Sequence, residues 1–128
     1  MRVISKDRIG TPGALILQRT TPGNWVFQVW DDVAKKWALA SWQGDLSDGE
    51  WHQLVGVVDP ARKKVQLYVD GELRAEAAWS AATLDDSDKA DLVIGADSGE
   101  AKFGQTFHGS IRSVRFLQGI VEQLPTAK

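Results

Sequence analysis

Few side chains in this 128-residue chain could act as a nucleophile or as an acid–base catalyst. The sequence has no cysteine and only two histidines, His52 and His108. A serine nucleophile needs a histidine base and a sharp turn of the form Gly-x-Ser-x-Gly, and the chain has no such motif. Each histidine directly follows a large aromatic residue, Trp51 or Phe107. We therefore expect both imidazoles to be structural groups, hydrogen-bonded near strand ends.

Carboxylates could serve glycoside hydrolysis, which needs two of them about 5–10 Å apart around the scissile bond. The glutamates lie at Glu50, Glu72, Glu76, Glu100 and Glu122. They do not form the set of alternating acidic residues on one strand that such an enzyme would use. Glu72 and Glu76 share a strand face, but Glu72 lies at a turn and Arg74 lies between them. Hydrolase activity is therefore the least favoured interpretation.

A metal site would have to be built mainly from aspartates. Two histidines without cysteine make a zinc site weak, whereas calcium accepts carboxylate and carbonyl oxygens. An acidic segment supplies Asp85, Asp86 and Asp88, and Asp97 follows shortly after it. The candidate calcium ligands are therefore Asp97 with Asp86 and Asp88. A solvated acidic loop is the alternative, because no Asp-x-Asp-x-Asp-Gly loop is present.

Tryptophan is the residue type best suited to ligand contact in this chain. Six are present, at Trp25, Trp30, Trp37, Trp42, Trp51 and Trp79. Trp30 and Trp37 flank an expected turn over residues 31–36, where indole rings could stack on the C–H face of a sugar. These two are the candidate ligand-binding residues. The alternative is that they pack against each other across neighbouring strands.

The elements that would carry these side chains are short strands. Apolar residues recur at every second position in runs broken by Gly, Asp, Asn and Pro, which is typical of β-structure. Strands are expected over residues 14–19, 25–30, 36–42, 51–59, 64–70, 73–78, 92–96 and 109–117, with a short one over 2–5. This spacing predicts a sandwich or barrel. Residues 81–91 are interpreted as a surface loop.

The hairpin over residues 51–73 has the clearest local signals. Asp70-Gly71 between two alternating strands predicts a tight type I′ turn. Strand 51–59 is apolar on both sides in its second half, so we expect it to lie centrally, covered on both faces. Gly56 within it predicts the close approach of a neighbour. Trp51 is expected to plug the end of the sandwich.

The composition fits a single globular domain over residues 1–128, with a hydrophobic fraction of 43%. A net charge of −2 gives no reason to expect a nucleic acid or acidic lipid partner. No apolar run approaches the roughly 20 residues of a membrane span. The first residues also lack the apolar stretch of a signal peptide, so a secreted parent protein would carry that signal elsewhere.

Several segments together resemble a known family. Residues 50–59 contain Trp51-His52 before an apolar strand, and residues 64–73 contain Tyr68 before Asp70-Gly71. Residues 92–96 are similar to the family's next strand, and residues 107–116 follow the pattern Phe-x-Gly-x-Ile-x-x-Val-x-Phe. In order and spacing these segments resemble laminin-G-like, concanavalin-A-like jelly-roll domains. The resemblance implies an antiparallel jelly-roll β-sandwich closed by strand 109–117.

The resemblance also implies a function. It suggests a non-catalytic recognition module that binds carbohydrate or protein within a larger extracellular protein, and many such domains hold one calcium ion at the sandwich rim. One alternative is a purely structural domain packed beside a catalytic one; another is a glycoside hydrolase of the same fold. The chain begins partway along the family's usual first strand, which suggests edge-strand self-association. The loops over 31–36 and 81–97 are the expected ligand contacts.

Overall fold

The structure, a computed structural model, describes residues 1–8, 11–84, 92–96 and 107–117. Its strands are β1 (Arg2–Arg8), β2 (Thr11–Thr21), β3 (Asn24–Asp31), β4 (Lys36–Gln43), β5 (Leu54–Asp59), β6 (Lys64–Val69), β7 (Glu72–Ala78) and β8 (Val93–Ile94). The described residues include no helix, and hence none that is long and apolar enough to cross a membrane.

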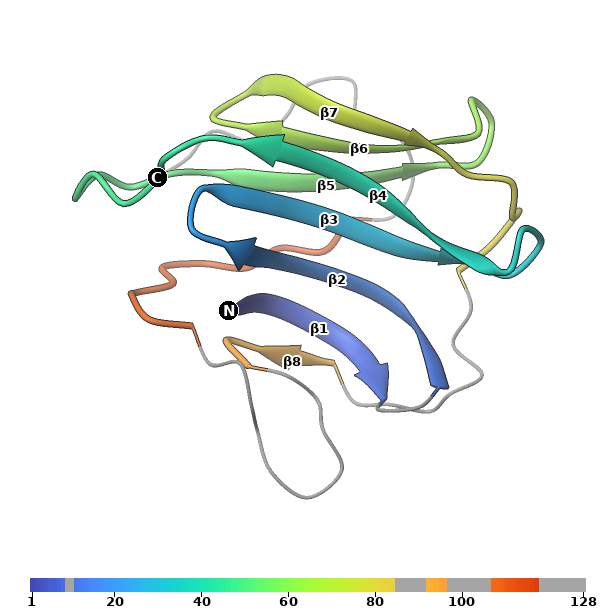
Figure 1. Cartoon of the computed structure of the whole chain (residues 1–128), viewed down its shortest axis with the longest axis horizontal. Helices are drawn as coiled ribbons and strands as arrows, with labels where there is room; N and C mark the ends of the chain where they lie inside the picture. Colours follow the sequence, from blue (N-terminus) through green and yellow to red (C-terminus); the bar gives the residue numbers. More distant parts are fainter. Residues whose placement is uncertain (9–10, 85–91, 97–106, 118–128) are drawn as a thin grey trace.

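The strands form two antiparallel sheets (Figure 1). The larger sheet has the order β4-β3-β2-β1-β8, and the smaller has the order β5-β6-β7. The smaller sheet contacts the larger one through β6 and β7, which lie against β3 and β4. The chain leaves the larger sheet after β4, builds the smaller one, and returns as β8 beside β1. The expected antiparallel β-sandwich is confirmed.

The core lies between the sheets and follows from the alternation of side chains along β3. Trp25, Phe27 and Val29 are buried on one face of β3, in one cluster with Val65 and Leu67 of β6. Burial of each such side chain contributes about 1.5–3 kcal/mol.

Gly56 of β5 faces this core and lets the second sheet approach closely. A Cβ atom at Gly56 would lie 2.6 Å from the ring of Phe27, a distance that such atoms essentially never show. The predicted close neighbour of Gly56 is therefore confirmed.

The turn between β6 and β7 has the predicted conformation. Val69 pairs with Glu72, which leaves a two-residue loop. The φ angles are 51° at Asp70 and 83° at Gly71, the left-handed region that a type I′ turn requires at both positions. Aspartate and glycine both tolerate a positive φ, so the two turn residues alone were enough to predict this hairpin.

The predictions for residues 51–59 are partly wrong. Strand β5 begins at Leu54, and it lies at the edge of the described three-stranded sheet rather than in its centre. Val55 and Val57 are only half-buried, because β-branched residues suit a pleated surface whether or not a second layer covers it. Trp51 does not plug the sandwich: it is 54% exposed, and the Arg112 guanidinium lies 4.3 Å from its ring centroid.

The predicted closing strand is also wrong. Residues 109–117 are described without any strand, and Phe116 is 57% exposed. Upstream, the Phe107 N–H donates to the carbonyl of Gly95, and the Phe107 side chain packs against the core. Residues 107–117 are therefore held to the fold through Phe107 and do not form the backbone hydrogen bonds of a strand. An alternating pattern shows that a segment suits a sheet, but a strand also needs a free edge to pair with, which the pattern does not reveal.

Other boundaries shift without changing the architecture. Strand β2 spans Thr11–Thr21 and is longer than the predicted 14–19, whereas β8 spans only Val93–Ile94 of the predicted 92–96. β1 extends to Arg8 and pairs with both β2 and β8. Part of the predicted loop, residues 81–84, is described and contains no strand; residues 85–91 lie outside the described part.

Candidate functional site

The turn between β3 and β4 is built around the carboxylate of Asp31. This side chain is 1% exposed, and its Oδ1 atom accepts the N–H groups of Val33 (3.1 Å) and Ala34 (3.0 Å). The Lys35 N–H donates to the Asp31 carbonyl at 2.8 Å, and Lys35 has a φ of 57°. An aspartate at the start of a turn commonly caps the following N–H groups in this way. The turn is therefore fixed from within.

A second layer of contacts ties this turn to the connection that follows β7. The Oδ2 atom of Asp31 accepts the Ser80 N–H at 2.7 Å, and the indole N–H of Trp79 donates to the Trp30 carbonyl at 3.2 Å. Burial raises the pKa of Asp31, but hydrogen bonds from three backbone N–H groups outweigh burial and hold that pKa below its ordinary value. Asp31 is therefore held as a carboxylate that joins two distant segments.

Trp30 and Trp37 lie directly opposite each other at the base of this turn. They form a cross-strand pair with ring centroids 5.6 Å apart and an interplanar angle of 75°. Since side chains alternate along β3, Trp30 points away from the core that contains Val29. The alternative of cross-strand packing is thus confirmed. Both rings nevertheless remain half-exposed, so their role in ligand binding stays a prediction.

Two exposed aliphatic side chains accompany the tryptophans. Val33, at the turn, is 69% exposed, and Leu39, two residues after Trp37 on the same face of β4, is 53% exposed. We refer to Trp30, Val33, Trp37 and Leu39 as the aromatic tip. The two aliphatic members were not predicted from the sequence. The alternation of large and small residues along β4 could have indicated Leu39, because it places Leu39 on the face of Trp37.

Polar contacts restrain the aromatic tip. The indole N–H of Trp30 donates to Oδ1 of Asp32 at 3.3 Å, and the Lys35 ammonium binds the same oxygen at 2.8 Å. The hydrogen bond from Lys35 and that from Trp30 lower the pKa of Asp32. The Trp30 ring is thus held by a hydrogen bond as well as by its packing against Trp37.

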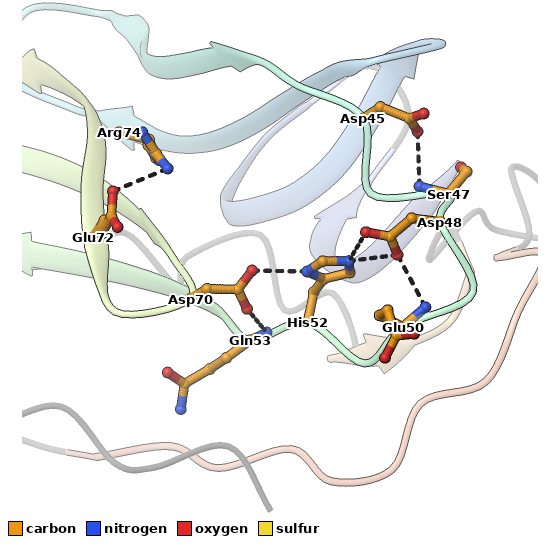
Figure 2. A network of polar contacts seen from close by, with 9 residues as sticks. All are labelled: Asp45, Ser47, Asp48, Glu50, His52, Gln53, Asp70, Glu72 and Arg74. Atoms are coloured by element: carbon orange, nitrogen blue, oxygen red, sulfur yellow. Dashed lines mark hydrogen bonds and ion pairs between the residues drawn. The ribbon is translucent and has the colours of Figure 1, made fainter.

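His52 lies between two aspartates from different loops (Figure 2). Its Nδ1 atom is 2.7 Å from Oδ2 of Asp70, and its Nε2 atom is 2.8 Å from Oδ1 and 3.0 Å from Oδ2 of Asp48. The hydrogen bonds to Asp70 and then to Asp48 raise the pKa of His52. We call this arrangement the His52 clamp.

The carboxylates of the clamp also accept backbone N–H groups. Burial raises the pKa of Asp70, but the Gln53 N–H and His52 outweigh it, so that pKa lies below its ordinary value. The Glu50 N–H and His52 lower the pKa of Asp48. A general base needs a free lone pair on its imidazole, and here both ring nitrogens face carboxylates. The predicted hydrogen bonding of His52 near a strand end is confirmed.

The glutamates considered for hydrolysis are engaged in ion pairs. Glu72 binds Arg74 at 3.0 Å, and Glu76 lies 3.5 Å from the Lys64 ammonium. A hydrogen bond from Gln66, followed by the charge of Lys64, lowers the pKa of Glu76. A general acid requires the opposite, a raised pKa. These contacts favour a structural role for both residues.

The structure leaves the predicted metal ligands untested. Asp86, Asp88 and Asp97 all lie outside the described residues, as does Asp85. Among the described residues, no group of three or more histidine, cysteine, aspartate or glutamate side chains is arranged to hold a metal ion. Calcium therefore stays a prediction that rests on the acidic segment alone.

Comparison with known proteins gives one family. A family model, Laminin_G_3, described as the concanavalin A-like lectin/glucanases superfamily, matches residues 2–123. Searches of curated proteins and of solved structures found no match. The matched range covers nearly the whole chain, including the aromatic tip and the His52 clamp.

Proposed function

Because this chain belongs to the concanavalin A-like lectin/glucanases superfamily, we propose that it is a non-catalytic module that binds carbohydrate through its aromatic tip. At the level of the superfamily, the match supports a carbohydrate- or protein-binding role. The choice of carbohydrate, the location of the site and an extracellular setting are the specific parts of this proposal.

The observation that carries the proposal is the half-exposed pair of Trp30 and Trp37 on the face opposite the core. Indole rings combine a large apolar surface with little conformational freedom, so they bind a flat apolar sugar face at small entropic cost. The partner contacts of Trp30 restrain its ring before any ligand arrives. Such preorganisation favours binding, since fewer groups need to be ordered in the complex.

Two further observations support a non-catalytic role. Glu72 and Glu76 are committed to ion pairs with basic residues, and both ring nitrogens of His52 are occupied. A hydrolase of this fold would need two close carboxylates, one of them with a raised pKa. The two aspartates of the β3–β4 turn, Asp31 and Asp32, both have lowered pKa values.

A glycan array tests the proposal, with the full chain and with the Trp30→Ala and Trp37→Ala variants, each with calcium and with a chelator. Trp51→Ala is the matched control, since Trp51 is 54% exposed but lies between β4 and β5 and not in the β3–β4 turn. We expect each tip variant to lose at least tenfold in affinity, about 1.4 kcal/mol, and the control to keep it. Equal binding by all variants would remove the aromatic tip from the site. Absence of glycan binding in both conditions would favour a structural module.

A protein ligand is the second candidate, and the exposure of Val33 and Leu39 favours it. Exposed aliphatic side chains contribute to protein interfaces through burial of apolar area. Val33→Ser and Leu39→Ser distinguish the two ligands. Glycan stacking should depend on the tryptophans and change less than threefold in the serine variants, whereas a protein interface should weaken with all four substitutions.

A further inference from the structure

The His52 clamp brings together the two Asp-Gly dipeptides of the chain, Asp48-Gly49 and Asp70-Gly71. They are separated by 20 intervening residues, yet both aspartates hydrogen-bond to the same imidazole (Figure 2). Asp-Gly is the dipeptide most prone to spontaneous isomerisation, because glycine has no side chain to hinder approach of its peptide nitrogen. His52 therefore contacts both aspartates whose sequence makes them most prone to this reaction.

The reaction needs no reagent except water. The glycine nitrogen attacks the side-chain Cγ of the aspartate and forms a C–N bond, while the amide proton and the carboxyl hydroxyl leave as water. Water then opens the five-membered succinimide. Attack at Cγ restores aspartate, and attack at the former peptide carbonyl gives isoaspartate, whose main chain runs through Cβ. The water lost in the first step returns in the second, so the product is an isomer of the starting chain.

The observed hydrogen bonds oppose the first step at both sites. Oδ2 of Asp70 binds the His52 ring at 2.7 Å, and Oδ1 accepts the Gln53 N–H at 2.9 Å. Both oxygens of Asp48 lie within 3.0 Å of the His52 ring, and Oδ1 also accepts the Glu50 N–H at 2.9 Å. For Cγ to meet the following nitrogen, each carboxylate would have to leave these donors. An ionised carboxylate also has no hydroxyl to lose as water.

We propose that His52 slows succinimide formation at Asp48 and Asp70, and that these two residues are the sites where isoaspartate forms when the histidine is removed. This role is independent of the ligand-binding function, since it concerns the lifetime of the chain. His52 would then have a role in addition to any contribution of its two hydrogen bonds to fold stability.

The two sites are coupled through the shared imidazole. Isoaspartate at position 70 would add a carbon to the main chain of a two-residue turn whose φ angles are 51° and 83°. It would also move the carboxylate that holds Nδ1 of His52. The imidazole would then be held from one side only, and Asp48 would lose part of its restraint. The first modification is therefore expected to speed the second.

Ageing of the full chain at neutral pH and 37 °C, followed by peptide mapping with mass spectrometry, tests the proposal. His52→Ala should form isoaspartate at both sites at least fivefold faster than the wild-type chain. Val65→Ala is the matched control: Val65 is fully buried in the core, so its truncation destabilises the domain without removing a contact of the His52 clamp. The control variant should remain near the wild-type rate at both sites.

Equal rates in the wild-type chain and in His52→Ala would overturn the proposal. Equal rates in His52→Ala and Val65→Ala would also overturn it, because global unfolding would then explain the reaction. If His52→Ala does not fold, His52→Gln replaces it, since its amide N–H₂ can donate to one of the two aspartates. One site in this variant should then react faster than the other. If both sites of the variant react at the wild-type rate, the proposed role of His52 is contradicted.

Discussion

The β3–β4 and β5–β6 turns have similar internal arrangements and differ mainly in their surroundings. Each begins with an aspartate that is nearly fully buried, Asp31 at 1% exposure and Asp59 at 3%. Each has a lysine in the left-handed region before the next strand, with φ of 57° at Lys35 and 58° at Lys63. In each, the aspartate Oδ1 atom accepts a backbone N–H from within the turn. The sequence shows this as Asp followed four and five residues later by Lys-Lys.

The surroundings of the two turns are different. The β3–β4 turn connects Trp30 with Trp37, whereas Val58 pairs with Val65 at the corresponding position beside the β5–β6 turn. The second oxygen of Asp31 binds Ser80, in a distant segment, while that of Asp59 lies 3.8 Å from its neighbour Arg62, which is 75% exposed. The hydrogen bonds of the aspartate therefore shape each hairpin turn, and the flanking residues determine how its surface differs from that of the other turn. The proposed binding role therefore rests on those flanking residues and not on the turn itself.

The largest difference between the turns should appear when each aspartate is removed. Asp31→Ala leaves three backbone N–H groups without their acceptor, two in the turn and one at Ser80. We expect a loss of about 3 kcal/mol in the free energy of unfolding, against about 1 kcal/mol for Asp59→Ala. Urea denaturation of both variants measures this difference. Equal losses would show that the additional N–H groups bound by Asp31, that of Ser80 included, add nothing to stability.

The pH dependence of stability should show the carboxylate character of Asp31. Its pKa lies below the ordinary value of 3.8, so its contribution is fully present above that pH and is lost as pH falls through the folded-state value. In Asp31→Asn this contribution is absent. The stability gap between wild type and Asp31→Asn should therefore be constant from about pH 5 to 7 and narrow below about pH 4.

Denaturation at a series of pH values measures the gap, with Asp59→Asn studied in parallel as the comparison for the simpler turn. A gap that stays constant down to pH 2 would contradict the assignment of the Asp31 pKa to its hydrogen bonds.

The smallest effect should be the same in both turns. A lysine in the left-handed region costs roughly 1–2 kcal/mol, which glycine avoids at an entropic cost of about 0.5–1 kcal/mol. Lys35→Gly and Lys63→Gly should therefore each stabilise the domain by about 0.5 kcal/mol. The exposed ion pair between Lys35 and Asp32 contributes little to this balance. Thermal unfolding compares the two variants, and changes of opposite sign would show that the turns differ in strain.

Local features of the fold could be predicted from the sequence. The Asp70-Gly71 turn depends on the conformational preferences of two adjacent residues, and the alternation of β6 depends on its own six residues. The pairing of Trp30 with Trp37 also follows from local spacing, because the turn between them sets the register. The predicted ligand candidates were therefore placed together correctly, although their contact with a ligand stays a prediction.

Features that depend on distant partners could not be predicted in this way. The exposure of Trp51 depends on which segment covers it, and Arg112 lies 61 positions later. Residues 109–117 alternate like a strand, yet a strand requires an edge to pair with. The clamp of His52 joins Asp48 to Asp70, and an exposed aspartate in a turn gives no sequence signal of such a contact. The hydrogen bond between Asp31 and Ser80 likewise joins residues 49 positions apart.

The contacts that Trp79 and Ser80 make with the β3–β4 turn have a consequence for the order of events during protein synthesis. The hairpin of β3 and β4 is complete once residue 43 has left the ribosome, but its final hydrogen bonds come from residues 79 and 80. Contacts of this sequence separation form late, because closing the chain between them costs entropy first. A nascent chain stalled before residue 79 would therefore display the aromatic tip on a hairpin that lacks its contacts with Trp79 and Ser80, and the proposed site would be complete only when the second sheet emerges.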